Sequence, residues 1–114
     1  MPELVAELDE AGVPLFAITN FSAEFWKPFR AREAWLFDRF RDIVVSGDEK
    51  LIKPDAAIYE LALRRFGLRA EEAFFVDDNA ANVEAARAMG ISAHLFEGVA
   101  GVRQTLVHLG ALAA

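Results

Sequence analysis

Two adjacent carboxylates, Asp77 and Asp78, occupy a position in the chain where they could bind a metal ion. They follow the apolar run 73–76, which is typical of a buried strand, and precede the alanine-rich segment 80–89, which is typical of a helix ended by Gly90. Adjacent carboxylates repel each other unless a cation or an ammonium group lies between them. Mg²⁺ is usually held by one or two carboxylates together with phosphate oxygens of a substrate. The pair therefore predicts a Mg²⁺ site in a turn between a strand and a helix.

Helix capping is the alternative explanation for the same turn, because Asp and Asn are common at helix N-termini. Asp77, Asp78 and Asn79 would then only accept hydrogen bonds from the main chain of the helix. Polar residues elsewhere in the chain favour the metal site over this explanation.

Thr19, Asn20 and Lys53 are polar residues at or near the ends of other predicted strands. The carboxyl ends of parallel strands converge at one edge of a sheet, so we expect these residues to lie beside the two carboxylates. Thr19 would donate its hydroxyl to a phosphoryl oxygen, and Asn20 would donate its amide or its main-chain N–H. Lys53 would neutralise the phosphoryl group and a nearby carboxylate. Each residue alone fits a turn or a surface position equally well, so the prediction depends on their joint occurrence.

The apolar periodicity predicts one helix followed by four strand and helix units. This order predicts an α/β fold in which a three-layer, Rossmann-like parallel sheet of four strands is flanked by helices, as a single domain over residues 1–114. A loop is expected at 46–50, and the aromatic residues of 21–40 are expected to close the core and the rim of a pocket. Strands are expected at 13–19, 43–45, 73–76 and 91–96, and helices at 2–11, from 23 onward, from Pro54 to 66, at 80–89 and at 102–109.

The composition excludes several classes of protein. A net charge of −6, a pI near 4.8 and the absence of any Lys/Arg-rich run argue against nucleic acid or an anionic membrane as the main partner. The chain has no cysteine, so it can form neither a disulfide nor a thiolate metal site. It contains no apolar stretch near about 20 residues and no signal-peptide pattern, so we expect a cytoplasmic protein.

The sequence resembles the haloacid dehalogenase-like (HAD) superfamily of hydrolases over nearly its whole length. The resemblance implies that Thr19 binds the transferred group, that Lys53 steadies it, and that Lys53 and Asp77 are catalytic. It also implies that Asp78 contacts Mg²⁺ directly, while Asp77 lies behind it or pairs with Lys53, and that Asn82 steadies the loop. The motifs that carry the resemblance are Ile18-Thr19-Asn20, Ile52-Lys53-Pro54-Asp55 and Phe75-Val76-Asp77-Asp78-Asn79-Ala80-Ala81-Asn82.

The chain departs from the family pattern at the nucleophile. HAD enzymes carry an Asp-x-Asp motif at the end of their first strand, and its first aspartate attacks the substrate. No Asp-x-Asp occurs in this chain, and Asp9 lies in the first predicted helix, away from any strand end. We therefore expect the C-terminal part of a HAD core domain, which lacks both the nucleophile motif and the cap.

A missing strand would leave two open sheet edges. In the family fold the nucleophile strand lies between the strand that ends at Thr19 and the strand that ends at Asp77. Its loss would leave backbone groups unpaired on both neighbours. We expect these edges to be satisfied by direct pairing of the two strands, by exchange of elements in a homodimer, or by another chain such as the missing N-terminal segment. A compact monomer with a gap between the two strands would contradict this expectation.

The leading functional hypothesis is descent from a Mg²⁺-dependent phosphatase that acts on a small phosphate monoester, with this chain inactive on its own. A 2-haloacid dehalogenase is the first alternative, which the aromatic stretch after Asn20 favours. That enzyme needs no metal, however, and its last motif would carry Ser and Asn in place of the two acids. A non-catalytic binding or regulatory domain that kept the phosphate and metal subsite is the second alternative.

Overall fold

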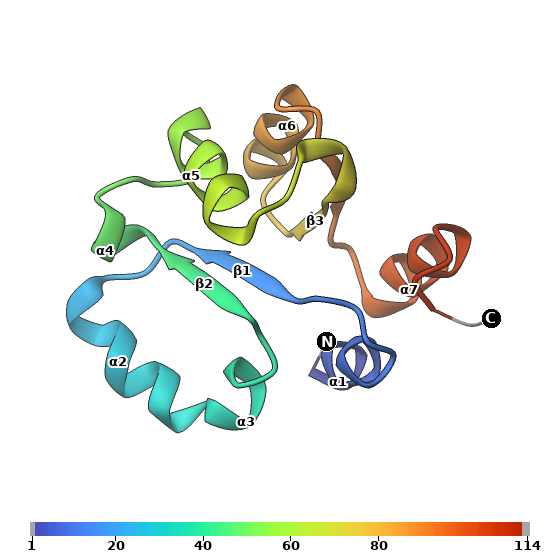
Figure 1. The fold of residues 1–114 in the computed structure, drawn as a ribbon, viewed down its shortest axis with the longest axis horizontal. Coiled ribbons are helices and arrows are strands. Elements are labelled where there is room, and N and C mark those ends of the chain that lie inside the picture. Colours follow the sequence, from blue (N-terminus) through green and yellow to red (C-terminus); the bar gives the residue numbers. More distant parts are fainter. Residues whose placement is uncertain (1, 113–114) are drawn as a thin grey trace.

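Strands and helices alternate along the chain, as the sequence predicts, and form an α/β fold (Figure 1). The structure is a computed structural model, and it describes residues 2–112. The strands are β1 (Phe16–Thr19), β2 (Asp42–Val45), β3 (Phe74–Asp77) and β4 (Ser92–Leu95). The helices are α1 (Pro2–Glu10), α2 (Ala23–Arg32), α3 (Ala34–Phe37), α4 (Ser46–Glu49), α5 (Ala56–Phe66), α6 (Ala80–Ala88) and α7 (Val99–His108), with a 3₁₀ turn at Ala70–Glu72.

The strands form two separate parallel pairs. β1 pairs with β2, with Thr19 opposite Val45, and β3 pairs with β4, with Asp77 opposite Leu95. Within residues 2–112, no ladder joins β1 to β3. The incomplete parallel sheet is confirmed, but the expected direct pairing of β1 and β3 is wrong for this chain. Closure of the gap by a second copy or another chain stays a prediction.

Helix α5 connects the two strand pairs because it packs against both. The ring of Phe66 stacks on Phe16 of β1 with centroids 4.4 Å apart. The ring of Tyr59 meets Phe75 of β3 edge to face at 5.7 Å.

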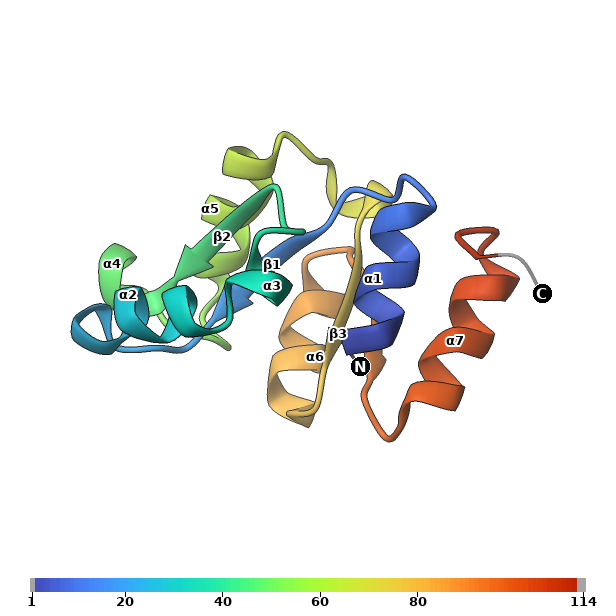
Figure 2. The ribbon, with the colours of Figure 1, turned by 90° about the horizontal axis from the view of Figure 1, so that it is seen from below.

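The two faces of the strands carry different hydrophobic clusters, which confirms the three-layer arrangement (Figures 1 and 2). α5 and α6 cover one face, and α1 and α7 cover the other. Burial of each such aliphatic or aromatic side chain stabilises the fold by about 1.5–3 kcal/mol. The buried residues are Val44, Ile58, Tyr59, Ala62, Ala86 and Ile91 in the first cluster, and Leu4, Leu8, Val102, Leu106 and Leu112 in the second.

The inner strands are less buried than the sequence predicts. Residues 73–76 were expected to lie in a strand buried on both faces, yet every residue of β1 and of β3 is only partly buried. In β2, by contrast, Val44 and Val45 are 0% and 2% exposed. The difference follows from the gap, because no strand covers the facing sides of β1 and β3.

The aromatic segment packs as a cluster beside β2. Its ring centroids lie 5.0–6.2 Å apart, in stacked, tilted and edge-to-face pairs. Trp26 is buried at its centre, whereas Phe25 and Trp35 are 60% and 59% exposed. The members are Phe21, Trp26, Phe29, Phe37 and Phe40.

Several predicted boundaries are wrong: the strand expected from residue 13 begins at Phe16, and the last helix, expected from residue 102, begins at Val99. Pro54 was expected at the first position of a helix, but α5 begins at Ala56. The main-chain N–H of Asp55 donates to the carbonyl of Ile52 at 2.9 Å, so residues 52–55 form a turn instead. The expected loop at 46–50 contains the short helix α4. Hydrogen bonds of Ser46 and Gly47 with the main chain of Phe21 hold this helix in place.

No helix in the described part of the chain has both the length and the apolar character needed to cross a membrane.

Arg65 of α5 fastens the outer edge of β2. It donates to both carboxylate oxygens of Asp42, at 3.1 and 2.7 Å, to Glu49 at 2.7 Å and to the carbonyl of Ile43 at 3.2 Å. The hydrogen bond from Arg65 lowers the pKa of Asp42, burial raises it, and the main-chain N–H of Ile43 lowers it; the net direction is down.

This pKa shift predicts acid-sensitive stability. The folded-state pKa of Asp42 lies below its unfolded value, so its contribution is complete above about pH 4 and is lost as pH falls through the folded pKa. We expect the free energy of unfolding to fall more steeply between about pH 5 and pH 2 in the wild type than in Arg65→Gln. Urea denaturation across this pH range measures the slopes, with the exposed neighbour Arg64→Gln as control. Equal slopes in the wild type and Arg65→Gln would contradict the assignment.

Candidate functional site

An ion pair between Lys53 and Asp77 lies at the carboxyl ends of the strands. Lys53 Nζ is 2.7 Å from Asp77 Oδ2, and the two side chains are only 11% and 8% exposed. The same ammonium lies 5.7 Å from the ring centroid of Phe75, within range of a cation–π interaction. The structure thus brings together two residues that are far apart in sequence, as the sequence predicts.

Asn20 fixes the main chain of Lys53. Its Oδ1 accepts from the N–H of Lys53 at 2.9 Å, and its Nδ2 donates to the carbonyl of Lys53 at 3.2 Å. Because Asn20 directly follows β1, these bonds place Lys53 relative to that strand. The side-chain amide of Asn20 is therefore committed to Lys53, and the main-chain N–H is the donor left for the predicted role in substrate binding.

Asp77 is held by three donors. Its Oδ2 accepts from Lys53 and, at 3.0 Å, from Nδ2 of Asn82, while its Oδ1 accepts from the N–H of Asn79 at 2.9 Å. Burial raises the pKa of Asp77, but the hydrogen bonds from Lys53, Asn79 and Asn82 and the charge of Lys53 together bring it below the usual value. Asp77 is therefore an ionised carboxylate paired with lysine, which is one of the roles that the sequence assigns to it.

Asn82 is buried and connects Asp77 to the start of α6. It is 6% exposed, and its main-chain N–H donates to the capping side chain of Asn79 at 3.2 Å. The hydroxyl of Tyr59 donates to the carbonyl of Asn82 at 2.9 Å. Burial, with a smaller effect of the Asp77 charge, raises the pKa of Tyr59 to about 12, so this donor keeps its proton.

Tyr59 is a supporting residue that the sequence reasoning missed. The sequence pattern assigned Ala62 and Phe66 to the buried face of this helix but not Tyr59. Tyr59 lies three residues before Ala62 and seven before Phe66. That spacing was the available signal, because residues three, four and seven apart share one face of a helix. Tyr59 is 0% exposed and joins α5 to the first turn of α6.

Thr19 and Asp78 keep their polar side chains available. Thr19 is the last residue of β1, and Asp78 is exposed directly after β3. In the described chain, neither side chain bonds to another residue. No group of three or more acidic or histidine residues within residues 2–112 could hold a metal by itself. One free carboxylate beside a lysine-paired one fits Mg²⁺, which takes one or two carboxylates and fills its other positions with water and phosphate oxygens.

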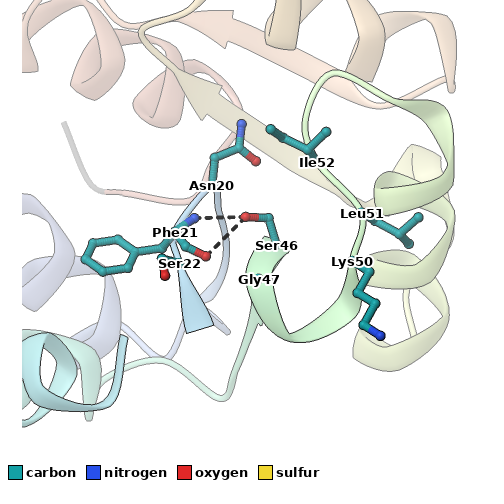
Figure 3. Close-up of a pocket in the computed structure, with 8 residues that line it drawn as sticks. All are labelled: Asn20, Phe21, Ser22, Ser46, Gly47, Lys50, Leu51 and Ile52. Carbon is teal, nitrogen blue, oxygen red and sulfur yellow. Dashed lines mark hydrogen bonds between the residues drawn. The ribbon is translucent and has the colours of Figure 1, made fainter. Parts of the chain in front are cut away.

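Ser46 and Gly47 fasten α4 to the loop after β1 (Figure 3). The hydroxyl of Ser46 accepts from the N–H of Phe21 at 2.9 Å and donates to its carbonyl at 3.3 Å. The N–H of Gly47 donates to the same carbonyl at 3.0 Å. A Cβ on Gly47 would overlap the main-chain nitrogen of Ala23 and lie 2.8 Å from the carbonyl oxygen of Phe21. Only glycine permits this close approach.

A cleft of about 400 Å³ opens between these two loops, beside Asn20. Apolar residues contribute much of its wall, and Ile52 is 53% exposed at its edge. Figure 3 shows the side chain of Lys50 directed away from Asn20. The lining residues are Asn20, Phe21, Ser22, Ser46, Gly47, Lys50, Leu51 and Ile52.

A model of the haloacid dehalogenase-like hydrolases matches residues 1–90. The sesquiterpene phosphatase astK of Aspergillus oryzae is 36% identical over 101 residues, which cover 88% of this chain and 51% of that protein. The phosphoglycolate phosphatase of Pectobacterium atrosepticum is 36% identical over 89 residues, which cover 77% of this chain and 37% of that protein. The chain therefore spans about half the length, or less, of the curated relatives that it matches.

The fold is shared with a solved structure of a HAD family enzyme from Bacteroides thetaiotaomicron. That structure is of a variant with an aspartate replaced by alanine, in complex with magnesium and inorganic phosphate. The TM-score is 0.76 at 24% identity, and the match covers 88% of this chain and 55% of the other.

The close approach at Gly47 predicts that Gly47→Ala destabilises the chain by about 1–3 kcal/mol, because the added methyl group forces two main-chain segments apart. Gly101→Ala is the matched control. Its Cβ would meet only Nε2 of His94 at 3.8 Å, an ordinary contact, and alanine in helix α7 is expected to stabilise by about 0.5–1 kcal/mol. Thermal unfolding compares the two variants, and a Gly47→Ala protein as stable as the wild type would refute the contact.

The burial of the ion pair predicts that Lys53→Met costs about 2–4 kcal/mol of stability, because Asp77 keeps a buried charge without its counter-ion. Adding Asp77→Asn is expected to recover much of this loss, since the amide carries no charge and Asn82 can present its own amide oxygen. Asp78→Asn, at an exposed carboxylate, is expected to change stability by less than about 0.5 kcal/mol. Chemical denaturation of Lys53→Met, Asp77→Asn, the double variant and the control Asp78→Asn measures the coupling, and additive losses would argue against the pair.

Proposed function

The chain belongs to the haloacid dehalogenase-like hydrolase family, and we propose that it contains the phosphate-binding and Mg²⁺-binding half of a phosphatase active site. The observation that carries the proposal is the buried pair of Lys53 and Asp77 beside the free carboxylate of Asp78. The substrate class that we propose is a small phosphate monoester.

The residues divide the task of holding a phosphoryl group. Lys53 supplies a positive charge at the carboxyl edge, the edge at which the carboxyl ends of the strands lie. Asn20 bonds to the main chain of Lys53 and Asp77 bonds to its ammonium group, so the two residues fix its position. Thr19, at the end of β1, donates its hydroxyl to a phosphoryl oxygen. Asp78 contributes a carboxylate ligand to Mg²⁺, and a bound Mg²⁺ would neutralise charge on the phosphoryl oxygens.

The organic part of the ester fits the cleft beside Asn20. Phe21, Leu51 and Ile52 give that cleft an apolar wall next to the residue that holds Lys53 in place. We propose that the cleft accepts a small apolar or weakly polar substituent.

Names of relatives support the phosphatase assignment over a dehalogenase. The two curated relatives described above carry phosphatase names, and the Bacteroides enzyme was solved with magnesium and inorganic phosphate although one of its aspartates had been replaced by alanine. That complex supports the idea that an altered site of this fold still binds both ligands.

We propose that the chain alone does not turn over a phosphate ester. Covalent phosphoryl transfer needs a carboxylate nucleophile, and we assign that role to neither Asp77 nor Asp9, while Asp78 is the proposed Mg²⁺ ligand. Asp77 is committed to Lys53, Asn79 and Asn82, and Asp9 of α1 pairs with Arg39 at 3.0 Å. The nucleophile would have to come from residues outside this chain.

Titration with inorganic phosphate, with and without Mg²⁺, tests the half-site. We expect Mg²⁺ to tighten phosphate binding, Lys53→Ala to weaken it about tenfold or more, and Asp78→Asn to remove the effect of Mg²⁺. Glu60→Gln, an exposed carboxylate on α5, is the control and is expected to bind like the wild type. Lys53→Ala should reduce phosphate affinity more than Mg²⁺ affinity. Equal losses would give Lys53 a purely structural role, and no phosphate binding at all would end the proposal.

An activity assay tests the missing nucleophile separately. We expect no hydrolysis of p-nitrophenyl phosphate by the purified chain with Mg²⁺, and no chloride release from a 2-chloroacid. Mg²⁺-dependent hydrolysis that Asp78→Asn abolishes would mean that a carboxylate of this chain serves as the nucleophile, contrary to the proposal. Chloride release that a chelator leaves unchanged would identify a dehalogenase instead.

A further inference from the structure

Tyr59 contributes a buried hydroxyl that core packing alone does not require. The side chain is 0% exposed, and its hydroxyl donates to the carbonyl of Asn82 at 2.9 Å. The regular bonding of helix α6 already gives that carbonyl a donor, the N–H of Ala86 four residues later. The ring alone would fill the same space, and a buried hydroxyl costs free energy unless it is bonded. The hydroxyl therefore calls for an explanation other than filling the core.

The hydroxyl of Tyr59 is connected to Asp77 through one residue. Asn82 presents its carbonyl to Tyr59, and its Nδ2 donates to Oδ2 of Asp77 at 3.0 Å. The same Oδ2 accepts from Lys53 at 2.7 Å. The main-chain N–H of Asn82 is held as well, by Oδ1 of Asn79 at 3.2 Å. Tyr59 thus helps to fix the turn from which Asn82 reaches the oxygen that Lys53 also binds.

The ring of Tyr59 is connected to the other partner of the ion pair. It meets the ring of Phe75 edge to face, with centroids 5.7 Å apart. The ammonium group of Lys53 lies 5.7 Å from the centroid of the same Phe75 ring. Because Tyr59 limits where Phe75 can lie, it also limits the position of a ring that attracts the ammonium group. One residue therefore contacts a neighbour of each charge.

Tyr59 also joins the starts of two helices that follow the charged residues. Helices α5 and α6 begin three residues after Lys53 and Asp77, respectively. Tyr59 lies in the first turn of α5 and Asn82 in the first turn of α6. The two helices pack side by side (Figure 1). The bond between the two turns therefore restrains the two chain segments that carry the ion pair.

We propose that Tyr59 is a positioning residue for the pair of Lys53 and Asp77. Its hydroxyl acts on Asp77 through Asn82, and its ring acts on Lys53 through Phe75. The two actions are separable, because Tyr59→Phe removes only the hydroxyl. Both can be measured in the free chain, whereas their effect on Mg²⁺ and phosphate rests on the function proposed above.

A double-mutant cycle with Asn82→Ala tests the action of the hydroxyl. Asn82→Ala keeps the carbonyl that Tyr59 bonds but removes the amide that reaches Asp77. We expect Tyr59→Phe to raise the unfolding equilibrium constant about tenfold in the wild-type background and about threefold or less beside Asn82→Ala. Ile58→Val, which removes one carbon from the same buried turn of α5, should have the same effect in both backgrounds. Equal effects of Tyr59→Phe in the two backgrounds would overturn the proposal.

The side-chain amide of Asn82 provides a spectroscopic signature. By NMR, its protons should exchange with solvent about three to ten times faster in Tyr59→Phe than in the wild type, and within about twofold of the wild type in Ile58→Val. If Tyr59→Phe does not fold, 3-fluorotyrosine replaces it in the experiment, since the chain has a single tyrosine. Its phenol is a stronger donor, so the amide should exchange more slowly. An unchanged amide would contradict the proposed link to Asp77.

Titration with phosphate and Mg²⁺ tests the consequence for the half-site. In Tyr59→Phe, the gain in phosphate affinity from Mg²⁺ should fall about three- to tenfold, because the first turn of α6 follows Asp78. Phosphate affinity without Mg²⁺ should stay within about twofold, because the ring still holds Phe75. Phe75→Leu should instead weaken phosphate binding without Mg²⁺ by about threefold or more.

The outcomes separate this inference from the proposed function. Parallel losses of both affinities in Tyr59→Phe and Phe75→Leu would make Tyr59 a purely structural residue and overturn the inference. A wild-type chain that binds neither ligand would end the half-site proposal. The cycle and the Asn82 amide would then still decide whether Tyr59 positions the ion pair.

Discussion

The structure depends on how two strand pairs that share no ladder are kept in register. At the carboxyl edge, two hydrogen bonds connect the pairs: Asn20, which follows β1, bonds to the main chain of Lys53, and the ammonium group of Lys53 bonds to Asp77 at the end of β3. Beneath it, α5 packs on both pairs through Phe66 and Tyr59. A buried ion pair is a weak source of stability, since desolvation offsets most of its attraction. Its geometric effect is larger here, because it sets the distance between the two halves of the site. The residues that we propose to bind ligand are thus also those that hold the halves together.

The gap and the site have a common origin in the topology. Parallel strands converge at their carboxyl ends, so the groups that end β1 and β3 lie near each other across the gap between the two strand pairs. Lys53 bridges that opening at its polar end, while the interior stays apolar. The polar groups proposed to bind ligand and the gap between the strand pairs are thus two consequences of one arrangement.

Sequence reasoning recovered the features that depend on local pattern. The alternation of strands and helices, their parallel pairing and the meeting of Lys53 with Asp77 follow from apolar periodicity and from the rule for strand ends. Features that depend on tertiary bonds were missed. α5 begins at Ala56 because Asn20, far away in sequence, holds the turn before it. The lack of direct pairing between β1 and β3 could not be foreseen either, because it depends on tertiary packing and not on local pattern.

The central claim is that the carboxyl edge holds a phosphate and Mg²⁺ without the nucleophile. A crystal structure of the chain grown with Mg²⁺ and inorganic phosphate tests it most directly. The account predicts phosphate within hydrogen-bond distance of Lys53 Nζ and the hydroxyl of Thr19, and Mg²⁺ bound to Asp78, with the pair of Lys53 and Asp77 retained. Phosphate bound elsewhere, or Lys53 turned away from Asp77 with the edge empty, would contradict it.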